Sequence, residues 1–143
     1  MKLDAKNVSV SIAGTTIVRN LSIEVPDLKF SALLGANGSG KTTLLRSIYR
    51  TQKMDSGIVR LDDKDITHFS DKKLARNMAV MGQFNQINFD YTVLDIALMG
   101  RYPFHSLLEQ ERERDYEIAL DALDKVGMKS YRDRNFQSLS GGE

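Results

Sequence analysis

Two stretches near the start of the chain alternate polar and apolar residues, the pattern of a half-buried β-strand. Residues 7–12 and 21–25 follow it, and the segment 13–16 between them, Ala-Gly-Thr-Thr, has the composition of a turn. The pattern therefore predicts an antiparallel hairpin. A further strand, residues 58–61, is predicted after the turn residues Asp-Ser-Gly at 55–57.

The next pattern joins a strand, a glycine-rich loop and a helix. Residues 29–34, Lys-Phe-Ser-Ala-Leu-Leu, form the short apolar run typical of a buried strand, and residues 43–49 continue with apolar side chains at helical spacing.

From Thr92 onward the spacing is helical. Thr92 and Asp95 form a capping-box pattern before the apolar run 96–99, and Gly100 is expected to end that helix. A short helix is expected at 71–76, with Ser70 as its cap. A longer helix is predicted over 109–126, with Gly127 as its stop. Its expected apolar face consists of Ile118, Ala119, Ala122, Leu123 and Val126.

Two features of these segments are predicted to carry no function. The charge-dense run 109–115 is interpreted as a solvated helix face with ion pairs between neighbouring turns. His68 and His105 have no Cys, Asp or Glu at metal-ligand spacing, so both are predicted to be surface or loop residues.

Composition narrows the classes of protein that fit. The chain has 143 residues, 41% of them hydrophobic, which suffices for one ordinary domain. With 20 basic and 19 acidic residues its net charge is +1, so no overall field favours nucleic acid as a partner. The absence of cysteine excludes disulfides and thiolate metal sites and fits a reducing compartment. No apolar stretch reaches the roughly 20 residues that span a bilayer, so a transport role would require a separate membrane subunit.

The glycine-rich loop carries the chemistry. Residues 35–42, Gly-Ala-Asn-Gly-Ser-Gly-Lys-Thr, match the pattern G-x-x-x-x-G-K-[ST] between the predicted strand and helix. Glycines let the backbone turn and approach phosphate oxygens, and the helix N-terminus adds a positive end. Lys41 would reach the β- and γ-phosphates, and the Thr42 hydroxyl would hold Mg²⁺. The predicted nucleotide-binding residues are Asn37, Gly38, Ser39, Gly40, Lys41, Thr42 and Thr43.

Two further motifs single out a family. The last five residues, Leu139-Ser140-Gly141-Gly142-Glu143, resemble the signature motif of ATP-binding cassette (ABC) proteins. The segment Val80-Met81-Gly82-Gln83-Phe84 resembles the Q-loop of the same family, which lies at the end of a strand. The resemblance implies that Ser140, Gly141 and Gly142 contact the nucleotide of a second ATPase subunit in a head-to-tail dimer. It also implies that Gln83 coordinates Mg²⁺ and the attacking water.

A third segment points within the family. Residues 99–104, Met-Gly-Arg-Tyr-Pro-Phe, resemble a segment of ATPases that serve importers of iron–siderophore, haem and cobalamin, although Phe104 replaces a histidine. The resemblance implies a permease partner that docks on residues 83–91 and 100–104, and a peripheral position on the cytoplasmic face of the cell membrane. Where the family usually places an aromatic residue against adenine, this chain has Ile12. An aliphatic residue forgoes part of a stacking interaction of about 1–3 kcal/mol.

The expected fold class is α/β: a P-loop NTPase of ABC type, with an antiparallel β subdomain and P-loop core over 1–91 and a helical subdomain over 92–143. The resemblance also implies that the chain is truncated before the Walker B strand, which carries the general base, so this portion alone is expected to hydrolyse little ATP. A non-transport member of the family, or a truncated nucleotide-binding module, is the alternative.

Overall fold

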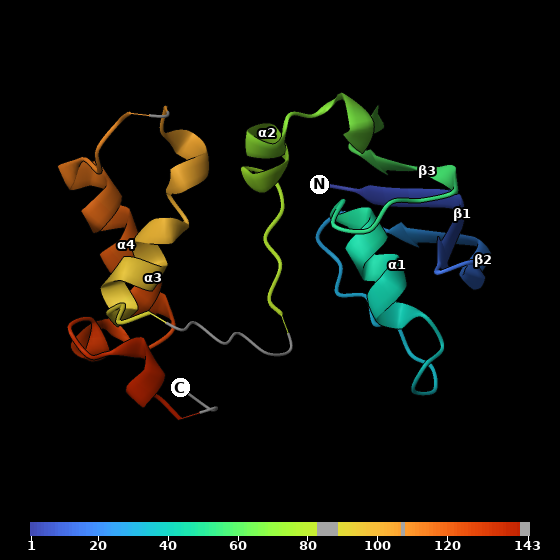
Figure 1. Ribbon diagram of the computed structural model, residues 1–143. Helices are drawn as coiled ribbons and strands as arrows, with labels where there is room; N and C mark the ends of the chain where they lie inside the picture. The colour runs from blue at the N-terminus through green and yellow to red at the C-terminus, as the bar shows by residue number, and fades with distance from the viewer. Residues whose placement is uncertain (83–88, 107, 141–143) are drawn as a thin grey trace. The chain divides into compact units, whose positions relative to one another are not determined.

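The computed structural model describes residues 1–82, 89–106 and 108–140. Contacts divide the chain into two compact units, Met1–Leu74 and Ala75–Glu143, and each has buried apolar side chains of its own. Figure 1 shows strands and α1 in the first unit and the helices α3 and α4 in the second. The expected division at residues 91 and 92 stays a prediction.

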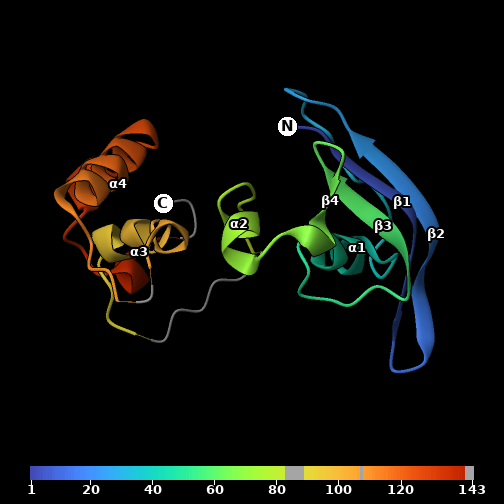
Figure 2. The same cartoon turned by 90° about the horizontal axis from the view of Figure 1, so that it is seen from above.

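The first unit contains a four-stranded antiparallel sheet in the order β2-β1-β3-β4 (Figure 2). Its strands are β1 (Leu3–Ile12), β2 (Thr15–Val25), β3 (Ser56–Leu61) and β4 (Lys64–Asp65). The predicted hairpin is confirmed: Ile12 pairs with Thr15, and the two loop residues Ala13 and Gly14 have φ of 49° and 79°. Left-handed conformations at both positions match the twist of the flanking strands.

Helix α1 (Lys41–Ile48) packs against β1 and β2. Its buried face, Leu44 and Ile48, meets a sheet whose Ala5, Val8 and Val10 are fully buried. A leucine, isoleucine or valine side chain stabilises the fold by about 1.5–3 kcal/mol when it is fully buried. This packing fixes the N-terminal end of α1, and with it the glycine-rich loop.

A short connection closes the unit. After β4 come a 3-10 helix, η1 (Ile66–His68), and α2 (Asp71–Ala75). The predicted cap of α2 is confirmed, since the Ser70 hydroxyl accepts a hydrogen bond of 3.3 Å from the Lys73 N–H. Arg50, just after α1, donates to the carbonyl oxygens of Ile66 and Phe69 and pairs with Asp71, so it links the end of α1 to this connection.

Gly57 lies where the backbone of β3 passes close to that of β1. Its φ is +99°, and a Cβ added there would stand 2.6 Å from the Cα of Val8 and 2.7 Å from the main-chain oxygens of Lys6 and Asn7. The register between β1 and β3 shifts at this point, between Lys6 and Ser9. This close approach, together with the positive φ, therefore excludes any side chain at position 57.

Two predicted strands do not form. Residues 29–34 have no strand conformation, and Phe30 and Leu34 are 96% and 87% exposed. Residues 80–82 are also irregular, with Met81 exposed. A buried strand needs hydrogen-bonding neighbours, and among the residues that the structure describes no strand pairs with either segment.

The second unit is helical. It contains α3 (Val93–Met99), the 3-10 helix η2 (Tyr102–Phe104), α4 (Glu113–Lys125) and the 3-10 helices η3 (Lys129–Tyr131) and η4 (Phe136–Ser138), and α3 packs on α4 (Figure 1). The predicted capping box is confirmed: Thr92 Oγ1 accepts from the Asp95 N–H at 3.1 Å, and Asp95 Oδ2 accepts from the Thr92 N–H at 2.8 Å.

Helix α4 differs from the prediction at its start and on its buried face. It begins at Glu113 rather than residue 109, because the Asp115 carboxylate accepts the Arg112 N–H and so ends the preceding loop. Ala119 and Leu123 are buried as predicted and Ile118 is half-buried, but Ala122 is exposed and Val126 is 69% exposed. Gly127, at φ +73°, follows the helix as expected.

Candidate functional site

The glycine-rich loop ends at the N-terminus of α1. Gly38 and Gly40 have φ of 80° and 88°, and the helix begins at Lys41. The Ser39 N–H donates to the Ala36 carbonyl at 3.2 Å, which closes the loop on itself. No acidic residue lies in the first turn of α1, so the unpaired N–H groups and the positive end of the helix remain available to an anion.

The loop is seated against β2 through Gly40. A Cβ at this position would lie 3.0 Å from the Ile17 carbonyl oxygen and 3.2 Å from the side chain of Val18. Combined with the positive φ, this close approach restricts position 40 to glycine. The sheet therefore determines how far the helix N-terminus projects.

Lys41 contributes the positive side chain of the site. Its ammonium donates hydrogen bonds of 2.7 Å to the carbonyl oxygens of Gly35 and Ala36, so the side chain curls back over the loop. Thr42 is exposed and Thr43 half-buried in the same first turn. The structure thus brings the predicted residues 37–43 together around one helix end. The arrangement suits a group with several anionic oxygens.

A pocket of about 300 Å³ opens beside the loop. Most of its lining is apolar and comes from β2, from α1 and from the exposed run 33–34; it includes Ile17, Val18, Leu21, Leu33, Leu34 and Leu44. Ile12, predicted to face adenine, lies outside this lining at the end of β1 and is 44% exposed.

The remaining predicted nucleotide contacts belong to other parts of the chain. Gln83, Gly141 and Gly142 lie outside the described residues. Ser140 is exposed and follows η4 in the second unit. Their roles stay predictions.

Exposed aromatic side chains mark the second unit. Phe89, Tyr102 and Phe104 are 68%, 54% and 45% exposed. The Arg101 guanidinium lies 4.2 Å from the centre of the Phe104 ring, and that of Arg76 lies 5.3 Å from it. Arg76 Nε also donates to the Pro103 carbonyl at 2.8 Å. Residues 100–104, predicted to contact a permease, therefore form a turn with aromatic rings at its surface.

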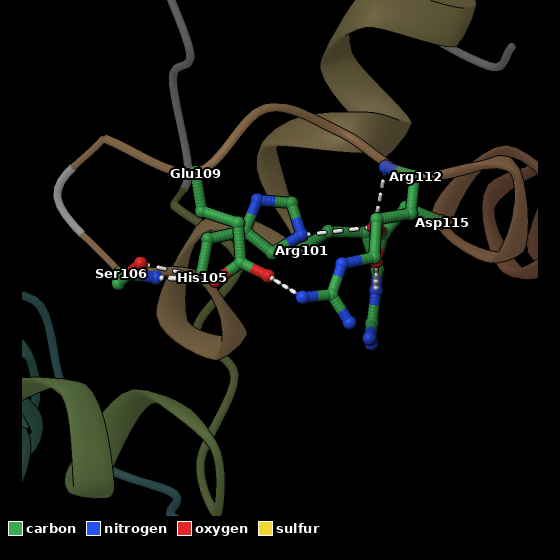
Figure 3. A network of polar contacts seen from close by, with 6 residues as sticks. All are labelled: Arg101, His105, Ser106, Glu109, Arg112 and Asp115. Atoms are coloured by element: carbon green, nitrogen blue, oxygen red, sulfur yellow. Dashed lines mark hydrogen bonds and ion pairs between the residues drawn. The ribbon is translucent and has the colours of Figure 1, made fainter.

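Beneath this turn lies a buried ionic cluster that the sequence did not predict (Figure 3). Asp115 Oδ1 accepts a hydrogen bond of 2.9 Å from Arg101 Nε, and Oδ2 lies 3.0 Å from His105 Nε2. Asp115 is 4% exposed and His105 9%. The prediction of a solvated face over 109–115 is therefore wrong at Asp115, whereas His105, predicted to be a surface or loop residue, is a loop residue whose side chain is buried.

The charge state of Asp115 follows from its neighbours. The Arg101 guanidinium, with further hydrogen bonds from the Arg112 N–H and His105, lowers its pKa to about 2. The carboxylate is ionised at neutral pH and only accepts hydrogen bonds, so His105 donates through Nε2–H.

A second carboxylate closes the neighbouring loop. Glu109 accepts hydrogen bonds from the N–H and hydroxyl of Ser106, at 3.0 and 3.1 Å, and pairs with Arg112 (Figure 3). The Ser106 hydrogen bonds lower the pKa of Glu109. In the sequence, the only hint of either cluster is that an arginine and a histidine come shortly before the charge-rich start of a helix. Local periodicity cannot tell such a buried cluster from a helix face that is exposed to solvent.

The chain matches one family model over residues 18–143, described as ABC transporter. It is similar to the petrobactin import ATP-binding protein of Bacillus anthracis, with 37% identity over 99% of this chain and 52% of the relative. It is also similar to the ferric enterobactin transport ATP-binding protein of Escherichia coli, with 33% identity over 99% of this chain and 52% of that relative. The chain thus spans about half the length of the curated relatives it matches.

Solved structures agree with this likeness. The chain is similar to a nucleotide-free ATP-binding cassette from an ABC transporter, with a TM-score of 0.84, 28% identity, and coverage of 99% of this chain and 60% of that one. It is also similar to an inward-facing metal-chelate type ABC transporter, with a TM-score of 0.77 and 28% identity. That match covers 98% of this chain and 50% of the other. In the part of the chain that the structure describes, no helix is long and apolar enough to cross a membrane.

Proposed function

The chain belongs to the ABC transporter ATPase family, and we propose that it acts as part of the ATP-binding subunit of an importer. The observation that carries this proposal is the glycine-rich loop at the N-terminus of α1, with the Lys41 ammonium held over it at 2.7 Å from two loop carbonyls. ATP is the expected ligand, and its binding and hydrolysis would drive substrate through a membrane partner.

The loop fits the phosphates of ATP. Gly38 leaves open space, since a Cβ there would meet no atom within 4 Å, and the adjacent helix end supplies unpaired N–H groups. Thr42, with Gln83, would hold Mg²⁺, which would neutralise phosphate charge when bound. Ser140, Gly141 and Gly142 would face the nucleotide of a second ATPase subunit.

The proposed substrate is an iron–siderophore, haem or cobalamin. The curated relatives named for petrobactin, ferric enterobactin and hemin uptake support the first two. The turn at residues 100–104, on which this expectation first rested, is ordered and exposes Tyr102 and Phe104. A position on the cytoplasmic face of the membrane, bound to the permease, follows from this function.

A docking experiment tests the importer proposal. Phe89→Asp and Tyr102→Asp should each reduce co-purification with the permease and reduce transport, while ATP affinity stays the same. Tyr116→Asp is the matched control, because Tyr116 is 42% exposed on α4 outside the turn. Substitution of Arg101 by Glu is a poorer test, since it would place a second carboxylate against buried Asp115. Unchanged complex formation and transport in both test variants would refute docking at this surface.

A further inference from the structure

One buried carboxylate holds both ends of the exposed turn Tyr102–Phe104. Arg101, immediately before η2, and His105, immediately after it, both bind Asp115, at 2.9 and 3.0 Å (Figure 3). Asp115 Oδ2 also accepts from the Arg112 N–H at 3.0 Å, which anchors the carboxylate at the start of α4. The turn is therefore attached to the helix through its two flanking residues.

The middle of the turn is held separately. Arg76 donates to the Pro103 carbonyl at 2.8 Å, and the Arg101 guanidinium that binds Asp115 also lies against the Phe104 ring at 4.2 Å. Arg101 thus connects the buried carboxylate directly to an exposed aromatic side chain. A change at Asp115 would therefore reach the exposed turn through Arg101 as well as through His105.

The alternatives for a buried Asp–His–Arg cluster fit less well. Among the described residues no group of three or more His, Cys, Asp or Glu side chains is placed to hold a metal. Both oxygens of Asp115 accept hydrogen bonds from neighbouring groups of the same unit, which suits a structural role. Asparagine, of the same size, would turn an N–H₂ group toward a donor.

We propose that Asp115 is a positioning residue for partner binding, which presents Tyr102 and Phe104 to the permease in a preformed arrangement. The inference rests on the proposed function, in which the partner docks on this turn. A surface that is already ordered loses less conformational entropy when it binds, so the cluster would act on affinity without touching the partner.

The first test measures order in the turn without a partner. The chain contains no tryptophan, so Tyr102→Trp introduces a single fluorescent reporter whose anisotropy reports its motion. Asp115→Asn should lower that anisotropy. Asp95→Asn, which weakens the capping box of α3 in the same unit, should leave it unchanged.

The second test measures affinity for the detergent-solubilised permease in a double-mutant cycle. Asp115→Asn should weaken binding about five- to tenfold in the native background. In a background of Tyr102→Ala and Phe104→Ala the same substitution should change binding less than about twofold, because the groups that it positions are gone. ATP affinity should remain unchanged in every variant.

The outcomes separate the two proposals. Equal weakening by Asp115→Asn in both backgrounds, or unchanged reporter anisotropy, would overturn the positioning role while leaving the docking surface in place. Native affinity in the Tyr102→Ala, Phe104→Ala variant would overturn the docking surface itself. Should Asp115→Asn fold poorly, His105→Phe removes only one of the three contacts and should give a smaller change in the same direction.

Discussion

The Lys41 ammonium donates a hydrogen bond of 2.7 Å to the carbonyl oxygen of Gly35, the residue that opens the same loop. A second bond of equal length reaches Ala36. Both acceptors are neutral, and a phosphate at the end of α1 would offer charged oxygens in their place. The present bonds carry charge on the ammonium alone, whereas a bond to phosphate would carry opposite charges on donor and acceptor, so the exchange favours bound nucleotide.

Replacing this lysine should therefore weaken nucleotide binding. We expect Lys41→Ala to reduce ATP affinity by about 1.5–3 kcal/mol, the range for hydrogen bonds to charged groups, or roughly ten- to a hundredfold. Calorimetry with Mg²⁺ measures this directly. Lys53→Ala, at an exposed lysine beyond α1, is the control and should bind ATP normally. Equal affinity in the two variants would rule out the loop as the phosphate site.

Gly40 should tolerate alanine less well than Gly14 does. Both have positive φ, which costs a side-chain-bearing residue about 1–2 kcal/mol, but only at Gly40 would the new Cβ meet neighbours, the Ile17 carbonyl at 3.0 Å among them. Gly40→Ala should therefore show the larger loss in denaturant-unfolding free energy and also weaken ATP binding. Gly14→Ala should lose only the unfolding free energy that the positive φ costs. Similar losses in both variants would mean that contact with β2 does not matter.

An aromatic side chain at position 12 should improve nucleotide binding. Ile12 is 44% exposed at the end of β1, which leaves room for a larger ring. If adenine lies there, Ile12→Tyr should tighten ATP binding by up to about 1–3 kcal/mol through stacking, with a smaller effect on inorganic triphosphate. No change, or weaker ATP binding, would show that adenine binds elsewhere.

Local patterns predicted the loop, the hairpin and the capping box because each depends on residues within a few positions of one another. Ile12 and Thr15 pair across a two-residue turn, and Thr92 and Asp95 are one helical turn apart. Asp115 and Arg101 are fourteen positions apart and meet only because α3 packs on α4. The prediction of a strand over residues 29–34 is wrong for a related reason. Their apolar pattern suits a buried strand, but a strand also needs neighbouring strands to pair with, and the local pattern does not show whether these are present.

Asp115 should give the protein an acid-sensitive increment of stability. Its pKa is lowered from the ordinary 3.8 to about 2 in the folded state, so the folded form binds a proton less readily than the unfolded form. The contribution is therefore present above about pH 4 and lost as the pH falls toward 2.

Melting temperatures of the native protein and Asp115→Asn, compared across this range, test the assignment. The native protein should melt higher at pH 5, and the difference should shrink as the pH approaches 2. Asp121→Asn changes an exposed residue of α4 and is the control. The difference in melting temperature between the native protein and this variant should vary little with pH. A gap between native protein and Asp115→Asn that is constant with pH would show that the carboxylate charge is not what stabilises the cluster.

Gly57 bears on how natural and engineered variants of this protein are interpreted. In a saturation screen, position 57 should reject every other residue as firmly as the loop glycines do, because any Cβ would meet the β1 backbone at 2.6 Å. Such intolerance is ordinarily taken as the mark of a binding site. Here it would reflect only the close approach of two paired strands, so loss of activity in a Gly57 variant would carry no information about nucleotide binding.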